Sequence, residues 1–323
     1  MRISFTYILL VLFLVSSCSR EEKTIKRTTV AMGTVVEVQV RGLDEETANK
    51  AINASFAEIR RLDTLFSTYL LGNEMWKINN SDSTRIKVDK EVFEMLKRCG
   101  QMWNETGGAF DIAIGNLIDL VGFEKDDPVL PPPQKIKEAL QEIGWKKIQL
   151  EEPDILIKPV HVKISFNACV PGYAADRVAD ILINKFGIND FLVNTGGEIV
   201  ARGNNWKIGI QHPRRQNELL NVVKIDGIGI TTSGDYEQFS KKNGKRFTHI
   251  FNPATGYPAN ECESVTIISH DAFTADALST GIFVLGPQKG MDLIEELPGT
   301  EALIVDTTGT VHKSSGFDKY LLR

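Results

Sequence analysis

Residues 273–285 read FTADALSTGIFVL, a run that predicts a helix buried among other elements. Within it, Asp276 and Thr280 are four residues apart, so their side chains lie on one face, one turn from each other. A carboxylate and a hydroxyl are hard oxygen ligands, which suit Mg²⁺ or Ca²⁺ better than zinc. The pair also fits a structural role, in which a buried Asp276 hydrogen-bonds to a neighbouring threonine. Either way the aspartate needs a partner, because burying an unpaired charge is costly.

The expected helices and strands around this helix do not follow a strict βαβ alternation, and they are not all strands. This pattern indicates the α+β class. Residues 191–251 are rich in Val, Ile, Gly and Thr and predict several antiparallel strands. We expect one domain of mixed antiparallel sheet and helices, or two intimately packed lobes. The expected helices begin after the caps Asp44 and Asp89 or cover residues 134–143, 173–186, 273–285 and 290–297. The expected shorter strands cover residues 30–40, with an interruption at Gly33, and 155–157, 162–166 and 302–305.

The first residues have the layout of an export signal. A positive start at Arg2 precedes an apolar run over residues 8–15, which is shorter than the ~20 residues that span a bilayer. Ser16 and Ser17 before Cys18 resemble the lipobox of bacterial lipoproteins, and a plain signal peptide with an incidental cysteine is the alternative. We expect a signal peptide over 1–17, a lipidated Cys18 with a tether to residue 27, and a folded domain over 28–323. The expected location is the bacterial cell envelope, on a lipid anchor that faces the periplasm or the exterior.

Charge and cysteine content argue against two classes of protein, namely nucleic-acid-binding proteins and disulfide scaffolds. The 323 residues carry a formal net charge of −5, and this mild acidity argues against nucleic acid as a partner. The cysteines other than Cys18 are Cys99, Cys169 and Cys262, which cannot all pair, so this is no disulfide scaffold.

A second cluster of polar residues follows an expected strand, at His249 in the sequence HIFNPATGYP. Histidine takes up a proton near neutral pH, which suits a general base for an alcohol nucleophile. The alternative is a structural histidine in a turn. Glycine-rich strand ends at 107–111, 194–198 and 232–236 could let the backbone approach a phosphate, or could be tight turns.

Taken in order, these stretches resemble the FAD:protein FMN transferase family, also called the ApbE family, in its lipoprotein form. The matching stretches are AMGTVVEV (31–38), LFSTYLLGNEMWKIN (65–79), TGGAFDIAIGNLIDLVGF (106–123), PGYAADRVADIL (171–182), NTGGEIVARG (194–203), TTSGDYEQF (231–239), THIFNPATGYP (248–258) and TADALSTGIFVLG (274–286).

The resemblance implies Mg²⁺ and FAD as substrate, with FMN transferred to a threonine hydroxyl of an acceptor protein and AMP released. It implies a metal held by Asp276, Thr280 and the backbone carbonyl of Ala168, with His249 near the phosphates as general base. The implied contacts to the flavin nucleotide come from Met32, Tyr69, Ala109, Phe110, Asp111 and the position of Pro171. The expected acceptors are flavin-carrying subunits of membrane redox complexes. A Mg²⁺-dependent FAD pyrophosphatase and a non-catalytic FAD-binding lipoprotein stay open as alternatives, and the sequence leaves the oligomeric state open.

The chain departs from the family pattern ahead of Gly172 and Tyr173. Ser165 stands where the family has aspartate, and Pro171 stands where it has lysine, glutamate or glutamine. Pro171 has neither a charge nor an N–H, so we expect one contact to the nucleotide to be lost. Asn252 likewise replaces a residue that is often acidic. The metal pair and His249 are retained, so we expect an active site with altered affinity.

Overall fold

The computed structural model describes residues 23–122, 130–203, 206–237, 239–242 and 245–322. The expected signal peptide and Cys18 lie outside these residues. An eight-stranded sheet forms the centre of the fold, and all neighbouring strands in it are antiparallel. In spatial order its strands are β1 (Thr24–Ala31), β2 (Thr34–Arg41), β6 (Phe191–Asn194), β7 (Ile199–Arg202), β10 (Ile228–Gly234), β13 (Cys262–Ser269), β14 (Glu301–Asp306) and β15 (Val311–Lys313).

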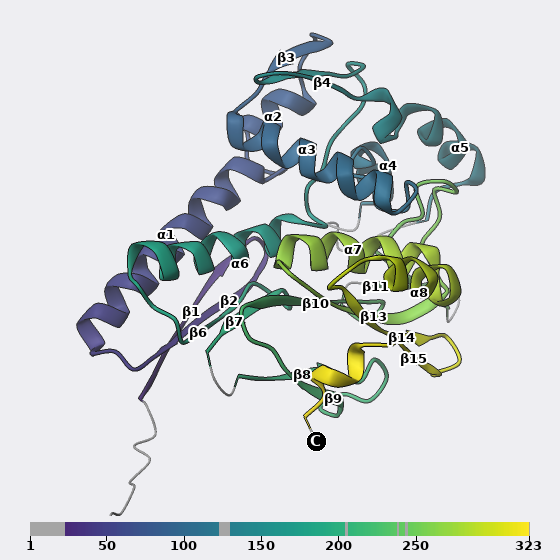
Figure 1. The fold of residues 1–323 in the computed structure, drawn as a ribbon. Helices are drawn as coiled ribbons and strands as arrows, with labels where there is room; N and C mark the ends of the chain where they lie inside the picture. Colours follow the sequence, from purple (N-terminus) through teal and green to yellow (C-terminus); the bar gives the residue numbers. More distant parts are fainter. Residues whose placement is uncertain (1–22, 123–129, 204–205, 238, 243–244, 323) are drawn as a thin grey trace, which may run out of the picture.

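Four helices form a layer on one face of this sheet (Figure 1). They are α1 (Glu45–Phe66), α6 (Val170–Asp180), α7 (Ala272–Leu285) and α8 (Pro287–Glu296). Helix α1 starts after Asp44, whose side chain accepts a hydrogen bond from the Thr47 N–H, as the sequence predicts. Helix α7 is buried along almost its whole length, in agreement with its apolar sequence.

The opposite face of the sheet is covered by the hairpin of β8 (Lys207–Gln211) and β9 (Leu219–Lys224) and by the short helix η3 (Phe317–Tyr320). Trp206, Ile210 and Phe317 pack there against Leu192 and Leu303 of the sheet. A separate hairpin, β11 (Phe239–Lys242) with β12 (Lys245–Thr248), leads to His249.

A second group of elements lies on the outer side of the helical layer (Figure 1). Asp89 caps α3 as predicted, by accepting a hydrogen bond from the Glu91 N–H. The group contains α2 (Glu74–Asn79), α3 (Lys90–Glu105), α4 (Gly115–Val121), α5 (Pro133–Glu142), η1 (Trp145–Lys147) and a small sheet of β3 (Arg85–Lys87), β5 (Ile155–Ile157) and β4 (Gln149–Glu151). The α+β class expected from the sequence is confirmed.

The structure corrects several expected boundaries. Residues 24–27, expected in the tether, pair with β2 as part of β1. The expected strand over 30–40 is a hairpin, because Met32 and Gly33 have positive φ and reverse the chain. Residues 162–166 form no strand, since the Ile164 N–H donates to the Asn79 side chain and the Ser165 N–H donates to the Ile112 carbonyl. The helix expected from residue 173 begins at Val170 and continues as a π-helical turn, η2 (Ile181–Lys185).

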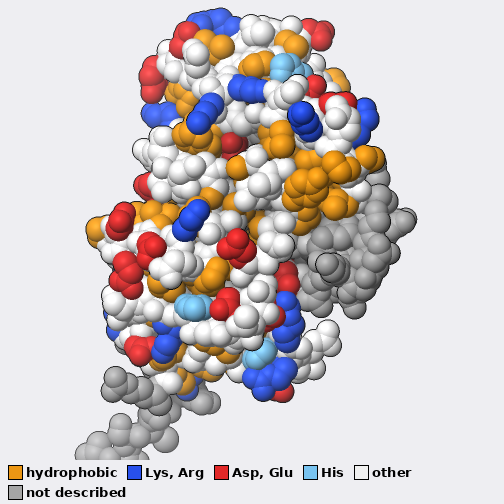
Figure 2. All heavy atoms as spheres, turned by 90° about the vertical axis from the view of Figure 1, so that its right-hand side faces the viewer, with side chains coloured by type: hydrophobic (Ala, Val, Ile, Leu, Met, Phe, Trp, Pro, Cys, Tyr) orange, Lys and Arg blue, Asp and Glu red, His pale blue; other side chains and the backbone are white. Residues whose placement is uncertain are grey.

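Within the described ranges, none of the helices is both long and apolar enough to cross a bilayer. The face on the right-hand side of Figure 1 carries scattered charges of both signs, and its hydrophobic side chains gather in a patch at mid-height (Figure 2).

Candidate active site

The carboxylate of Asp276 lies in the buried interior between α7 and α6. The residue is 5% exposed, and its Oδ2 accepts a hydrogen bond from the Gly172 N–H at 3.0 Å. Burial raises the pKa of Asp276 well above its usual range, and the negative charge of Glu198 adds to the rise. Asp276 is therefore a buried acid that is costly to ionise unless a cation lies close to it.

A close approach of α6 to α7 produces this arrangement. A Cβ on Gly172 would lie 2.4 Å from the Ala272 carbonyl oxygen and 2.8 Å from the Asp276 Cβ, so only glycine fits. Ala168 lies just ahead of α6, four residues before Gly172, and is half-buried. Thr280, also half-buried, is one turn beyond Asp276 on α7. The contact between Gly172 and Asp276 thus brings the start of α6 against α7, with Ala168 four residues from Gly172 and Thr280 four residues from Asp276 along the chain.

This donor set fits a hard divalent cation. A carboxylate, a hydroxyl and a backbone carbonyl are oxygen donors of the kind that Mg²⁺ and Ca²⁺ prefer. Among the described residues no three His, Cys, Asp or Glu side chains form a metal-binding group, so a protein-only cage of such side chains is not built there. Within the same residues Asp276 has no ion pair with a lysine or arginine. A Mg²⁺ held partly by substrate phosphates is compatible with so few protein ligands.

The segment expected to contact the flavin lies against the same part of α7. A Cβ on Gly281, next to Thr280, would lie 2.7 Å from Thr106 Cγ2 and 3.3 Å from Phe110 Cβ. Ala109 and Phe110 are buried, and the Phe110 N–H donates to Thr106 Oγ1 at 3.0 Å.

Asp111 in this segment has its carboxylate engaged with the protein. It accepts hydrogen bonds from the Trp103 Nε1–H at 3.1 Å, the Trp145 N–H at 2.9 Å and the Ala113 N–H at 2.8 Å. Burial raises its pKa, and these three donors oppose the rise. The contacts give Asp111 a role in holding the second group of elements together, and its contact to the nucleotide stays a prediction.

Met32 and Tyr69 lie at the C-terminal end of α1. Met32, at φ +53°, donates its N–H to Asp63 Oδ2 at 3.1 Å. Tyr69 is 55% exposed, and its Oη accepts a hydrogen bond from Asn167 Nδ2 at 3.2 Å, beside Ala168. Tyr69 thereby contacts the side chain of the residue that precedes Ala168, whose carbonyl is expected to bind the metal.

Pro171 occupies the first turn of α6, where its missing N–H costs nothing because such groups lack intrahelical partners. Its carbonyl accepts a hydrogen bond from Thr195 Oγ1 at 2.8 Å. The proline is thus compatible with the fold. The loss of the expected side-chain contact would change the affinity for the nucleotide and not the structure of α6.

His249 follows β12 and enters a turn that packs beneath α5. Gly256 in this turn has φ +72°, and a Cβ there would lie 2.6 Å from Ile136 Cγ2. Asn252 accepts a hydrogen bond from the Ala254 N–H through its side chain, so it stabilises the turn. Ile250 packs in the same core cluster as Phe110, and His249 itself is half-buried.

Nothing in the sequence indicates that Glu198 lies near Asp276, although Glu198 belongs to a glycine-rich strand end named above. Burial raises the pKa of Glu198 to about 8, and the negative charge of Glu237 adds to the rise. Ser279 donates from Oγ to the Asp276 carbonyl at 2.8 Å and contacts Ser233 Oγ at 2.7 Å. Glu198 and Ser233 belong to the quoted stretches NTGGEI and TTSG, but no local spacing marks their approach to α7.

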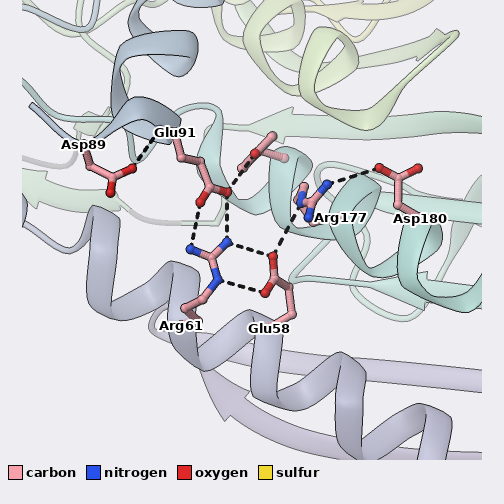
Figure 3. A network of polar contacts seen from close by, with 7 residues as sticks. Glu58, Arg61, Asp89, Glu91, Arg177 and Asp180 are labelled. Carbon is pink, nitrogen blue, oxygen red and sulfur yellow. Dashed lines mark hydrogen bonds and ion pairs between the residues drawn. The ribbon is translucent and has the colours of Figure 1, made fainter. Parts of the chain in front are cut away.

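A polar network joins α1, α3 and α6 behind the site (Figure 3). The Arg61 guanidinium bonds both to Glu58, at 2.8 and 2.9 Å, and to Glu91, at 2.7 and 2.9 Å. Tyr173 Oη donates to Glu91 at 2.8 Å, and Arg177 pairs with Glu58 at 3.4 Å. The hydrogen bond from Arg61 lowers the pKa of Glu58 more than any other contact does. Two α6 residues just beyond Gly172 are therefore tied to the neighbouring helices.

Sequence comparison identifies the family to which this arrangement belongs. The sequence profile described as the ApbE family matches residues 32–304. The chain belongs to the ApbE family. The family expected from the quoted motifs is therefore confirmed, and the match contains every expected metal and flavin residue of this ApbE-family chain.

Relatives and solved structures agree with this assignment. The chain is 31% identical to the FAD:protein FMN transferase of Haemophilus influenzae over 325 residues, which cover 95% of this chain and 94% of the relative. It is 33% identical to an FAD:protein FMN transferase of Klebsiella pneumoniae, with 82% and 79% covered. The crystal structure of the ApbE protein from Thermotoga maritima superposes with a TM-score of 0.87 at 30% identity, covering 93% of this chain and all of that one. The flavinyl transferase ApbE from Pseudomonas stutzeri, in its apo form, superposes with a TM-score of 0.82 at 29% identity, covering 93% and 97%.

Proposed function

We propose that this ApbE-family enzyme transfers FMN from FAD to a threonine hydroxyl of an acceptor protein and releases AMP. The observation that carries the proposal is the buried Asp276, held against the first turn of α6 with Thr280 one turn away. The relatives named above, called FAD:protein FMN transferases, support the transfer of FMN from FAD to a protein. The acceptors that we propose are flavin-carrying subunits of membrane redox complexes.

The residues would have three roles: holding a cation, positioning the nucleotide and accepting a proton. Asp276, Thr280 and the Ala168 carbonyl would hold Mg²⁺, which neutralises charge on the pyrophosphate oxygens of FAD. The Thr106–Phe110 segment and Tyr69 would position the flavin nucleotide.

His249 would take the proton of the acceptor hydroxyl. The threonine oxygen forms a bond to the FMN phosphorus, and the bond from this phosphorus to the bridging oxygen breaks. AMP departs with that oxygen.

The test combines an acceptor assay with the His249→Ala variant. The full chain is incubated with FAD and Mg²⁺, with and without a co-expressed flavin-carrying subunit of an envelope redox complex. We expect that subunit to gain the mass of FMN minus water on one threonine. Free FMN and AMP formed without acceptor would instead indicate a pyrophosphatase, and FAD binding with neither product a non-catalytic flavin carrier. Normal transfer by His249→Ala with FAD bound would exclude the general-base role.

We further propose that the protein works at the bacterial cell envelope, anchored by a lipid on Cys18 and facing the periplasm or the exterior. The apolar run and the Ser-Ser-Cys pattern support this location. Metabolic labelling with a fatty acid should label the full chain and leave Cys18→Ala unlabelled.

A further inference from the structure

Two buried cysteines from distant parts of the chain touch each other. Cys99 on α3 and Cys169, the residue just before α6, are 70 positions apart, and their Sγ atoms lie 3.7 Å from each other. Both are thiols in the structure, and Cys99 is 1% exposed and Cys169 0%. Cys262 is also buried, but among the described residues it contacts no other cysteine.

The two sulfurs meet because α3 and α6 are both fastened to α7. Arg98, next to Cys99, pairs with Asp271 at 2.9 Å, where α7 begins. At the start of α6, the Gly172 N–H donates to Asp276 of α7 at 3.0 Å. The contacts that build the candidate site therefore also bring the two thiols together.

The sulfur atoms are close enough to be oxidised to a disulfide. Because an S–S bond is about 2.05 Å long, they need to approach each other by only about 1.7 Å. Two such thiols can also serve as small apolar core residues. The compartment decides between these roles, since cytosolic thiols are kept reduced and exported proteins form and keep disulfides.

We propose that Cys99 and Cys169 are joined by a disulfide bond in the exported protein. The inference rests on the proposed location at the cell envelope, and it goes beyond the proposed FMN transfer, which uses neither thiol. Cys169 directly follows Ala168 in the chain. The crosslink therefore ties α3 to the segment whose carbonyl is proposed to hold the metal.

The bond forms by thiol–disulfide exchange with the disulfide of an oxidising protein in the envelope. One cysteine, as a thiolate, attacks a sulfur of that disulfide and displaces the other sulfur. The second cysteine then attacks the mixed disulfide, so the new S–S bond forms and the oxidant leaves as a dithiol. The two cysteines lose two electrons and two protons, and the oxidant gains both.

The burial of the pair determines when this exchange takes place. An oxidant cannot reach either thiol in the folded protein, so the exchange occurs before α3 and α6 have packed. The finished bond is then shielded from reductants. It also closes a long loop, and a disulfide restricts the unfolded chain more as the enclosed loop becomes longer.

The first test determines the oxidation state of each cysteine in cells. Cells that produce the full chain are quenched in acid, and the denatured protein is treated with N-ethylmaleimide, either directly or after reduction. By mass spectrometry we expect Cys99 and Cys169 to be modified only after reduction, and Cys262, the matched control, in both samples. Direct modification of Cys99 and Cys169, or a bridge to Cys262, would overturn the proposal. A fatty-acid label on Cys18 in the same sample would then show that the location stands without the disulfide.

The second test measures the stability of the protein purified from these cells. Urea unfolding is followed at equilibrium with and without a phosphine reductant, which we expect to lower the midpoint by about 1 M. Cys262→Ala should keep this difference, and the double variant Cys99→Ala with Cys169→Ala should lose it. Because each variant is compared with itself, the cost of the cavities left by alanine cancels. A wild-type midpoint that is equal in both solutions would overturn the proposal.

Discussion

Asp176 and Asp276 each accept hydrogen bonds from the first turn of the other's helix. Asp176 on α6 accepts them from the Ala272 N–H at 2.8 Å and the Phe273 N–H at 2.9 Å, where α7 begins. Asp276 on α7 accepts one from the Gly172 N–H in the first turn of α6. The free N–H groups of a helix N-terminus carry partial positive charge, so both contacts are favourable. The reciprocal pair sets α6 antiparallel to α7, since Gly172 meets Asp276 and Asp176 meets Ala272.

Replacing Asp276 with Asn should separate metal binding from folding. The amide can still accept from the Gly172 N–H, but it removes the buried charge. We expect the metal-free variant to be at least as stable as the wild type, with the rise in Tm on adding Mg²⁺ lost and FMN transfer lowered about 100-fold or more. Calorimetry with and without Mg²⁺ measures this. Asp292→Asn, on the exposed surface of α8, is the control. A variant that keeps the Mg²⁺-dependent rise in Tm would contradict the assignment.

Asp176 should make stability depend on pH. Burial raises its pKa to about 7, and the negative charge of Asp271 adds to the rise. The folded state therefore holds this proton more tightly than the unfolded chain. The resulting stabilisation is complete below the ordinary pKa near 4 and is lost as pH rises through about 7. Asp176→Asn lacks this loss, so its Tm relative to the wild type should rise by a few degrees between pH 4 and about 8. A constant difference across this range would show that Asp176 is not protonated.

Gly172→Ala should destabilise the pair of helices, because the new Cβ would meet the Ala272 backbone and Asp276. We expect a loss of about 1–3 kcal/mol and a parallel loss of activity. Gly209→Ala on β8 is a matched control, since its nearest atom is Leu219 Cδ2 at 2.8 Å, the end of a side chain that is 58% exposed and can move aside. Thermal denaturation of the two variants compares them, and equal Tm values would refute the steric account.

Lys158 is a buried cation whose removal should stabilise the protein. It is 1% exposed, and none of the described carboxylates pairs with it. Burial lowers its pKa to about 8, so wild-type stability should rise between pH 8 and about 10.5 as the unfolded chain keeps its proton. Lys158→Met should be more stable at pH 7 by about 1–3 kcal/mol, with a gain that shrinks over that interval. Denaturant titrations of the wild type and the variant at pH 7 and 10 measure their free energies of unfolding. A gain in stability that is the same at both pH values would contradict a lowered pKa of Lys158 in the folded state.

Pro171→Lys should introduce a positive charge, because lysine is one of the residues that the resemblance leads us to expect at this position. We expect FAD to bind about tenfold more tightly, because a charge-assisted contact to phosphate is added. Pro171→Ala restores the N–H without the charge and separates the two effects. Quenching of flavin fluorescence measures the affinity, and no gain with Lys would mean that the side chain does not reach the nucleotide.

Local signals predicted much of the secondary structure. Asp44 and Asp89 mark the starts of α1 and α3 because capping depends on residues only two or three positions away. The strand expected over residues 162–166 is absent, because the hydrogen bonds of this run depend on residues that are distant in the sequence. Its hydrogen bonds go to Asn79 and Ile112, whose approach no local pattern reveals.

By itself, the sequence determined the family, the α+β class and the pair Asp276–Thr280, since motif order and helical spacing are read along the chain. Only the tertiary structure decided that Asp276 meets Gly172, 104 residues away, and that burial, together with the charge of Glu198, raises the pKa of Asp276. Burial and long-range charge depend on which distant segments the fold brings together, and short-range patterns carry no record of that pairing.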